Sequence, residues 1–168
     1  LIFGTGGSGS ADQFGYASDG RFYFANVLTA TGLITTNNWI HVAASRSGTT
    51  QKLFINGVVQ LTSTISGTIG QNLAGYIGRR NDTYSPVNGY ISNLRIVNGT
   101  ALYTANFIPQ ITPLTPVTNT VLLTCQSAGF VDNSAKNNVV SNVGDTKTQR
   151  FSPYGATIQT PQTYSGYF

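Results

Sequence analysis

The segment between residues 38 and 60 constrains the fold most strongly, because tight turns separate three strand-like runs there. From Trp39 to Arg46 apolar residues occupy both sides of a two-residue repeat, which predicts a β-strand with both faces covered. Gln51 to Ile55 resumes the alternation after turn residues at 47–49. Asn56-Gly57 then predicts a type I′ turn, since both residues tolerate a positive φ. We therefore expect three antiparallel strands in a meander. In the first strand, Ile40, Val42 and Ala44 are predicted to lie on one face and Trp39, His41 and Ala43 on the other. In the second strand, Leu53 and Ile55 are predicted to lie on one face and Lys52 and Phe54 on the other.

The composition favours an all-β fold over a helical one. Charged residues make up 8% of the 168 residues, no glutamate is present, and 19 glycines are spread along the chain as turn signals. Thr, Ser, Asn and Gln supply the polar character instead, which suits strands with uncharged outer faces and gives a helix few of its better formers. The length suits one domain with its own core.

Patterns elsewhere predict further strands. A hairpin of aromatic strands is expected from Gln13–Tyr16 and Arg21–Phe24. The only helical signal is one short turn near residues 100–105, and the prolines that follow it predict an extended linker over residues 109–118. The remaining predicted strands are Ala74–Gly78, Asn88–Ile96, Val121–Cys125 and Val139–Val143.

Several function classes are not expected. Gly4–Gly9 has the spacing of a dinucleotide-binding loop, but a predicted strand follows it where that motif needs a helix, so we interpret it as a loop. The net charge of +4 is scattered, which argues against nucleic acid as a partner, and no apolar run approaches the ~20 residues of a membrane span. The lone Cys125 predicts a buried, inert thiol. Because the chain lacks methionine and begins inside a strand-like run, we expect it to be part of a longer protein.

The motifs Trp39-Ile40-His41-Val42-Ala43, Leu53-Phe54-Ile55-Asn56-Gly57 and Leu94-Arg95-Ile96 resemble the second half of a laminin G-like, concanavalin A-like jelly roll. The continuation from Ala101 to Pro109 resembles the version of this domain found in tail and fibre proteins of tailed bacteriophages. Residues 121–127, with Asp132-Asn133-Ser134, resemble the opening of such a domain in a displaced position. The resemblance implies an antiparallel β-sandwich. Residues 1–115 would form the later part of a jelly roll, and residues 116–168 would open a second jelly roll or complete the same sandwich.

Catalysis is not expected from this chain. Glycoside hydrolysis, which some concanavalin A-like families perform, needs two carboxylates ~5 to 9 Å apart. None of the five acids has the spacing that would aim a pair from one strand, and His41, inside an apolar strand, predicts a packed structural histidine. The acids are Asp12, Asp19, Asp82, Asp132 and Asp145.

The polar loop between Arg79 and Asn88 is the predicted binding site. A sugar needs a flat aromatic surface and planar polar partners, which this loop supplies in Arg80, Asn81, Asp82, Tyr84 and Asn88. The alternative is a solvated connection in which Tyr84 caps a sheet edge. Laminin G-like domains can hold a calcium ion at the rim, and the resemblance makes Asp82 a weak candidate ligand; no other cofactor is expected.

The resemblance implies a non-enzymatic virion structural protein of a tailed phage, located in the extracellular particle. Its expected partners are identical copies and other virion proteins, because a jelly roll with unpaired strand edges tends to associate. The alternative is a lectin-like module that binds a host-surface glycan or receptor. An endoglycanase is disfavoured by the missing glutamates.

Overall fold

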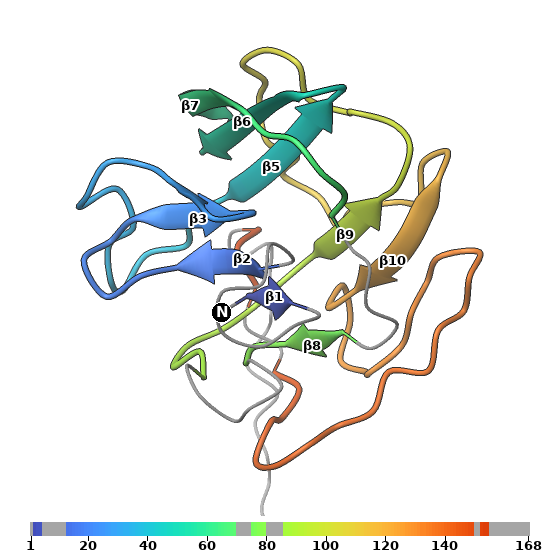
Figure 1. Ribbon diagram of the computed structural model, residues 1–168. Helices are drawn as coiled ribbons and strands as arrows, with labels where there is room; N and C mark the ends of the chain where they lie inside the picture. The colour runs from blue at the N-terminus through green and yellow to red at the C-terminus, as the bar shows by residue number, and fades with distance from the viewer. Residues whose placement is uncertain (1, 5–12, 70–74, 80–85, 150–151, 155–168) are drawn as a thin grey trace, which may run out of the picture.

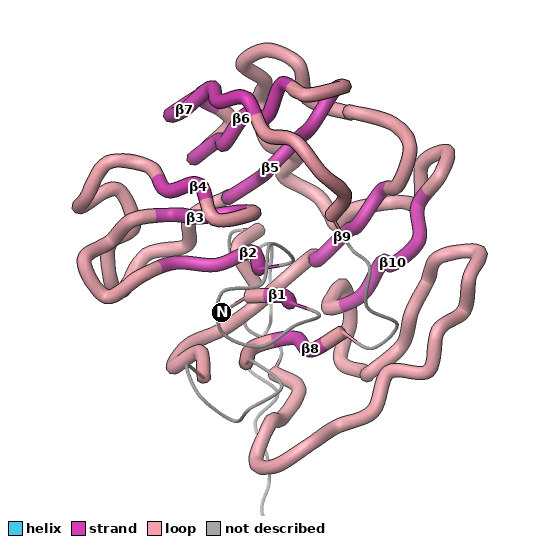
Figure 2. Tube along the Cα trace, viewed as in Figure 1, coloured by secondary structure: helices cyan, strands magenta, loops and turns pink. Residues whose placement is uncertain are grey.

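The computed structural model describes residues 2–4, 13–69, 75–79, 86–149 and 152–154. This part of the chain is built from ten strands, every strand pair is antiparallel, and it holds no helix that could cross a membrane (Figures 1 and 2). The all-β prediction is confirmed. Residues 100–105 form bends and carry no helical turn. The strands are β1 Phe3–Gly4, β2 Gln13–Tyr16, β3 Phe22–Phe24, β4 Val27–Leu28, β5 Val42–Ser47, β6 Thr50–Ile55, β7 Val58–Thr64, β8 Tyr76–Ile77, β9 Leu94–Val97 and β10 Thr120–Thr124.

The strands form three sheets. One has the order β4-β3-β2-β1-β8, the second is the predicted meander β5-β6-β7, and the third pairs β9 with β10. The Gln51 side chain, which is fully buried, links the first two sheets, since its Nε2 on β6 donates to the Phe24 carbonyl on β3 at 3.0 Å. Figure 1 shows the meander beside β3, with β9 and β10 on the other side of the molecule.

The core lies between the meander and the aromatic hairpin. Phe22 of β3 and Leu53 are fully buried, and Ile55 is 7% exposed. Leu53 and Ile55 face this core as predicted, because a strand turns alternate side chains to one face. The partly buried residues packed against the cluster are Phe14, Phe24, Val27, Leu33, Ile34, Ile40, Val42, Ala44 and Leu61.

The opposite face of the meander is also covered, as the apolar pattern on both sides predicted. Phe54 is fully buried there, with its ring centroid 5.3 Å from that of Phe107, and the His41 ring lies 5.5 Å from the same phenylalanine. The first strand begins at Val42, three residues later than expected. The turn residue Asn56 accounts for this, because its Oδ1 accepts from the His41 N–H at 3.0 Å and its N–H donates to the His41 carbonyl at 2.8 Å.

The turn between β6 and β7 has the predicted conformation. Asn56 has φ of 50° and Gly57 φ of 78°, and Ile55 pairs with Val58 across a two-residue loop. Gly57 is required for a second reason. A Cβ there would lie 1.9 Å from the Phe107 carbonyl oxygen, and the Phe107 N–H donates to the Gly57 carbonyl at 2.9 Å. The turn therefore anchors the segment that covers Phe54.

Asp132 closes the outer edge of β10. Its carboxylate is 3% exposed and accepts from the Leu123 N–H at 2.9 Å. Asn133 donates its N–H to the Leu123 carbonyl, and Asn138 Nδ2 donates to the Val121 carbonyl. These groups take the place of a neighbouring strand. The other donors to the carboxylate are the Ser134 N–H and Oγ, both at 2.9 Å, and the Asn138 N–H at 2.8 Å and Nδ2 at 2.6 Å.

Two strand predictions differ from the structure. Residues 139–143 form no strand, and Val139 is 95% exposed, because no neighbouring strand pairs with this segment. Of the expected strand over residues 88–96, only Leu94–Ile96 is paired, as part of β9, since the preceding residues form a loop. β10 pairs with β9, and the expected division of the chain at residue 115 stays a prediction.

Candidate functional site

The predicted carbohydrate site falls mostly outside the described residues, which exclude Arg80, Asn81, Asp82 and Tyr84. Asn88 is described and is exposed. The loop that it follows is tied at its base, because the Val87 N–H donates to the Gly78 carbonyl at 2.7 Å. Among the described residues no group of three His, Cys, Asp or Glu side chains could hold a metal ion, so calcium at Asp82 stays a prediction.

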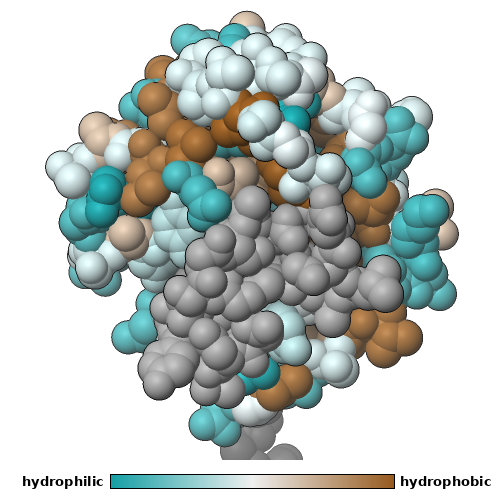
Figure 3. Space-filling model, viewed as in Figure 1, coloured by the Kyte–Doolittle hydropathy of each residue, from teal (hydrophilic) through white to brown (hydrophobic). Residues whose placement is uncertain are grey.

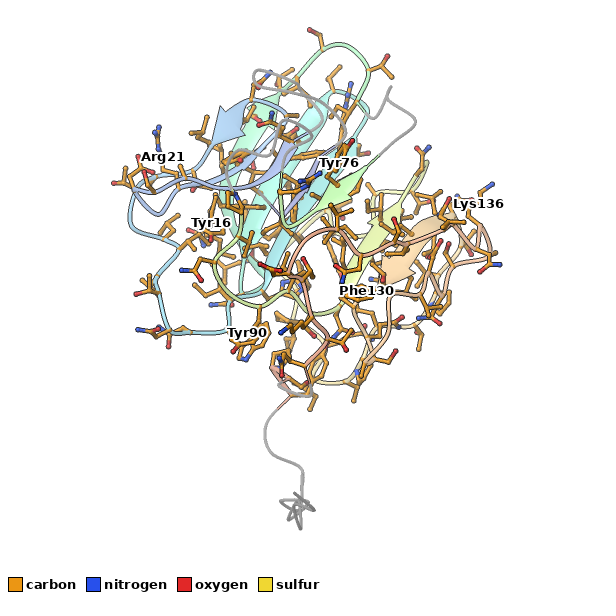
Figure 4. The ribbon with its side chains drawn as sticks, turned by 90° about the horizontal axis from the view of Figure 1, so that it is seen from below. Tyr16, Arg21, Tyr76, Tyr90, Phe130 and Lys136 are labelled. Atoms are coloured by element: carbon orange, nitrogen blue, oxygen red, sulfur yellow. The ribbon has the colours of Figure 1, made fainter. Side chains whose placement is uncertain are left out.

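Tyr90 adds an exposed aromatic ring two residues beyond Asn88. It is 60% exposed, and its ring centroid lies 6.3 Å from that of Trp39, with the two ring planes at 44°. Figure 4 shows Tyr90 at the margin of the molecule. Exposed asparagines lie in the same two loops, at Asn38, which precedes Trp39 and whose Nδ2 donates to the Thr35 hydroxyl and the Thr36 carbonyl, and at Asn88, two residues before Tyr90. An aromatic face flanked by planar amides is suited to stacking on a sugar ring.

The sequence offered little to identify this pair. Trp39 and Tyr90 are separated by 51 positions, and the sequence pattern predicts a strand over residues 88–96 that includes Tyr90. The structure puts Tyr90 in the loop before β9. A cation–π contact lies at the start of the predicted binding loop, where the Arg79 guanidinium carbon is 5.4 Å from the Tyr76 ring centroid.

An apolar hollow of about 300 Å³ lies over the segment that leads to β10. Four apolar side chains on this segment are exposed: Ile108 at 92%, Ile111 at 83%, Leu102 at 37% and Val117 at 36%. Prolines in the segment prevent it from pairing as a regular strand. The hollow is lined by Arg95, Leu102, Tyr103, Phe107, Ile108, Gln110, Thr115 and Val117.

The base of the apolar hollow is held by specific contacts. The Tyr103 and Phe107 rings are stacked, with centroids 3.7 Å apart and planes 7° apart. Arg95 on β9 donates through Nη2 to the Tyr103 hydroxyl at 3.3 Å and through Nη1 to the Thr115 carbonyl at 3.1 Å. The hollow is therefore a formed surface on the outer side of the meander, where Phe107 also packs against Phe54.

A second hollow, of about 220 Å³, lies on the same outer side, and most of its lining residues carry a hydroxyl group. Lys52 of β6 reaches across it, and its Nζ donates to the Thr104 carbonyl. The Lys52 ammonium group is thus already paired with a main-chain carbonyl. The lining residues are Ser45, Ser47, Thr50, Lys52, Tyr103 and Thr104.

The described acidic and basic groups do not assemble catalytic machinery. Asp19 forms an ion pair with Arg21 at 2.7 Å, and Asp132 is buried under its five donors. Within the described part of the chain, these two and the exposed Asp145 are the carboxylates, and no pair of them flanks a hollow. Burial and, to a lesser extent, the Arg95 charge lower the pKa of His41. His41 is packed against Phe107, as its place in an apolar run predicted, and its purely structural role stays a prediction.

Comparison with known proteins agrees with this geometry. A sequence model of the concanavalin A-like lectin/glucanase superfamily, in its laminin G form, matches residues 1–104. No curated protein and no solved structure was found to match. The match spans β1 to β9, which includes the meander, the aromatic hairpin and the loop of Tyr90. This chain therefore belongs to the concanavalin A-like lectin/glucanase superfamily.

Proposed function

We propose that the chain is a non-enzymatic structural module of a tailed-phage particle, in a tail or fibre, that works through contact with neighbouring subunits. The apolar hollow carries this proposal. Monomeric proteins rarely expose contiguous apolar patches larger than a few hundred Å², and larger patches mark contact sites. Here Ile108 and Ile111 are 92% and 83% exposed beside a hollow whose base is held by Tyr103 and Phe107.

The phage setting is supported by the sequence of the same region. The segment Ala101–Pro109, which resembles phage tail and fibre proteins, supplies Leu102 and Ile108 to the hollow. The engagement of Asp19 with Arg21 and of Asp132 with its hydrogen-bond donors favours a contact role over glycoside hydrolysis.

Sedimentation velocity with a single substitution tests the proposal. Ile108→Ser should weaken self-association of the purified chain, because it removes the most exposed side chain of the hollow. Val139→Ser is the matched control, since Val139 is equally exposed at 95% but lies outside the hollow. An equal effect of both substitutions, or none from Ile108→Ser, would contradict a contact at this surface.

The Tyr90 surface favours a second candidate function, glycan binding by a lectin-like module. The support is an exposed ring packed on Trp39 with Asn38 and Asn88 exposed in the same loops. The predicted residues Arg80, Asn81, Asp82 and Tyr84 precede Asn88 in the sequence.

A glycan array tests the second candidate. Tyr90→Ala should abolish binding and Tyr90→Phe should preserve it, because stacking on a sugar needs the ring and not the hydroxyl. Asn88→Ala should weaken binding through loss of a planar hydrogen-bonding partner. A parent chain that binds no glycan, or a Tyr90→Ala variant that binds as well as the parent, would rule out a site at Tyr90.

A further inference from the structure

The edge strand β7 is open to another chain along half its length. It is the outer strand of the meander, and its seven residues, Val58 to Thr64, include no charge and no proline. An edge strand presents unpaired main-chain groups, and proteins usually protect such edges with charges, prolines, short strands or covering segments. The end of the molecule that carries β5, β6 and β7 is mostly pale in Figure 3, which is the colour of near-neutral side chains.

The other described strands at sheet margins show the usual protection. β4 and β8 have two residues each, and β5 carries Arg46. β9 has four residues and carries Arg95. The outer edge of β10 is covered by Asp132, Asn133 and Asn138. β7 lacks each of these devices over its second half.

The direction of the main-chain groups of β7 follows from the turn. A two-residue loop makes Ile55 and Val58 a hydrogen-bonded pair, so the groups of Val59 point away from β6. The Val59 N–H does donate outward, to Asn106 Oδ1 at 2.9 Å. After the bulge opposite Leu53, the alternation directs the main-chain groups of Thr62 and Thr64 outward.

The two halves of the edge therefore differ. The first half is capped by Asn106 and by Phe107, whose N–H donates to the Gly57 carbonyl. No hydrogen bond to the outward groups of Thr62 or Thr64 exists within the part of the chain that the structure describes. Both threonines are exposed. As far as the described residues go, a strand that approaches β7 at Thr62 and Thr64 would meet outward donors and acceptors with no hydrogen-bond partner.

We propose that residues 62–64 of β7 pair antiparallel with the same residues of a second copy of this chain, so that Thr62 of each copy lies opposite Thr64 of the other. The pairing would join two three-stranded sheets into one of six strands about a two-fold axis. In a two-fold contact each surface meets its own copy, so any charge would be brought near a like charge. A neutral edge of Thr62, Ser63 and Thr64 avoids this, and a lysine at position 62 would not.

This contact deepens the proposed particle role and uses a different surface from the apolar hollow. A two-fold contact alone closes into a dimer, whereas a second, different contact allows the dimers to build a larger assembly. The two surfaces can be tested separately. Thr62→Lys alters only the edge of β7, and Ile108→Ser alters only the hollow.

Light scattering coupled to size-exclusion chromatography tests the pairing. The parent chain should reach twice its mass of 17.9 kDa as concentration rises. Thr62→Lys should raise the dimer dissociation constant at least about tenfold, the equivalent of one lost interaction of ~1.4 kcal/mol. Thr62→Val, which is neutral and of similar shape, should dimerise like the parent. Thr36→Lys places the same charge on an exposed loop and should have no effect.

A backbone variant keeps the test independent of charge. Thr62→Pro removes an N–H that points away from β6, so the meander should stay intact while dimerisation is lost. Circular dichroism and the fluorescence of Trp39 report whether each variant is folded. A parent chain that stays monomeric, or a folded Thr62→Lys variant that dimerises as well as Thr62→Val, would overturn the pairing. If Ile108→Ser alone abolishes association, the pairing fails and the proposed function stands.

Discussion

Replacing Asp132 by asparagine tests how the outer edge of β10 is stabilised. The carboxylate is 3% exposed and accepts five hydrogen bonds, from the N–H groups of Leu123, Ser134 and Asn138 and from the side chains of the last two. Burial alone would raise the pKa of Asp132, but these hydrogen bonds outweigh it and lower the pKa from 3.8 to about 2. The folded state therefore stabilises the ionised form of Asp132 over the protonated form.

The expected magnitude follows from this pKa. A change from 3.8 to about 2 corresponds to about 2.5 kcal/mol in favour of the ionised form, at ~1.36 kcal/mol per pH unit. An asparagine at position 132 has no charge and so loses this stabilisation. Its NH₂ group would also point at N–H groups that now donate to the carboxylate, and these buried donors would be left without an acceptor. We expect Asp132→Asn to lower the free energy of unfolding by about 3 to 5 kcal/mol near neutral pH.

The pH dependence has a definite sign. Because the pKa of Asp132 is lower in the folded state, its contribution is complete above pH 3.8 and is lost as the pH falls towards 2. Urea unfolding followed by Trp39 fluorescence should show this loss in the parent chain and not in Asp132→Asn. Asp145→Asn, at an exposed turn, is the control and should change stability by less than ~0.5 kcal/mol. A cost below ~1 kcal/mol for Asp132→Asn, or an unchanged acid response, would refute the reasoning.

Three further predictions concern the turn, the histidine and the thiol. Gly57→Ala should lower the free energy of unfolding, measured in urea, by at least ~2 kcal/mol, because the added Cβ would collide with the Phe107 carbonyl. Gly48 also has a positive φ but lies in open space, so Gly48→Ala should lower it by only ~1 kcal/mol. Equal losses for the two variants would exclude the collision. The pKa of His41 is lowered in the folded state, so the unfolded chain takes up this proton first and the free energy of unfolding should fall as the pH drops below 6.5. His41→Phe should remove this fall in stability. If the fall persists in the variant, it does not come from His41. Burial raises the pKa of the Cys125 thiol, so iodoacetamide should modify the folded chain more slowly than the unfolded one, and equal rates would contradict an inert thiol.

The local signals in the sequence predicted the meander well. The alternation over Gln51–Ile55 and the Asn56-Gly57 pair determine which side chains face the core and how the turn is formed. These features depend on neighbours within a few residues, so a single sequence reveals them. The aromatic hairpin of β2 and β3 was predictable for the same reason.

The contacts between distant segments were not predictable in this way. The valines from Val139 to Val143 have strand propensity, but no partner strand pairs with them, and propensity alone does not make a ladder. Asn56 ends the ladder beside His41 through a side-chain hydrogen bond, and Asp132 replaces a strand at the edge of β10. The contact between Trp39 and Tyr90 likewise depends on two loops meeting, and Asn88 is the one predicted site residue among those that the structure describes.

The central claim is a β-sandwich in which β6 is the middle strand of the meander and the edge of β7 is a contact surface. Amide hydrogen exchange at two protein concentrations tests this claim most directly. The amides of Gln51, Leu53 and Ile55 should exchange slowest at both concentrations, because they lie in the middle strand of the meander. The Thr62 amide should exchange quickly in dilute protein and slowly in concentrated protein. Fast exchange along β6, or exchange at Thr62 that does not change with concentration, would contradict the account.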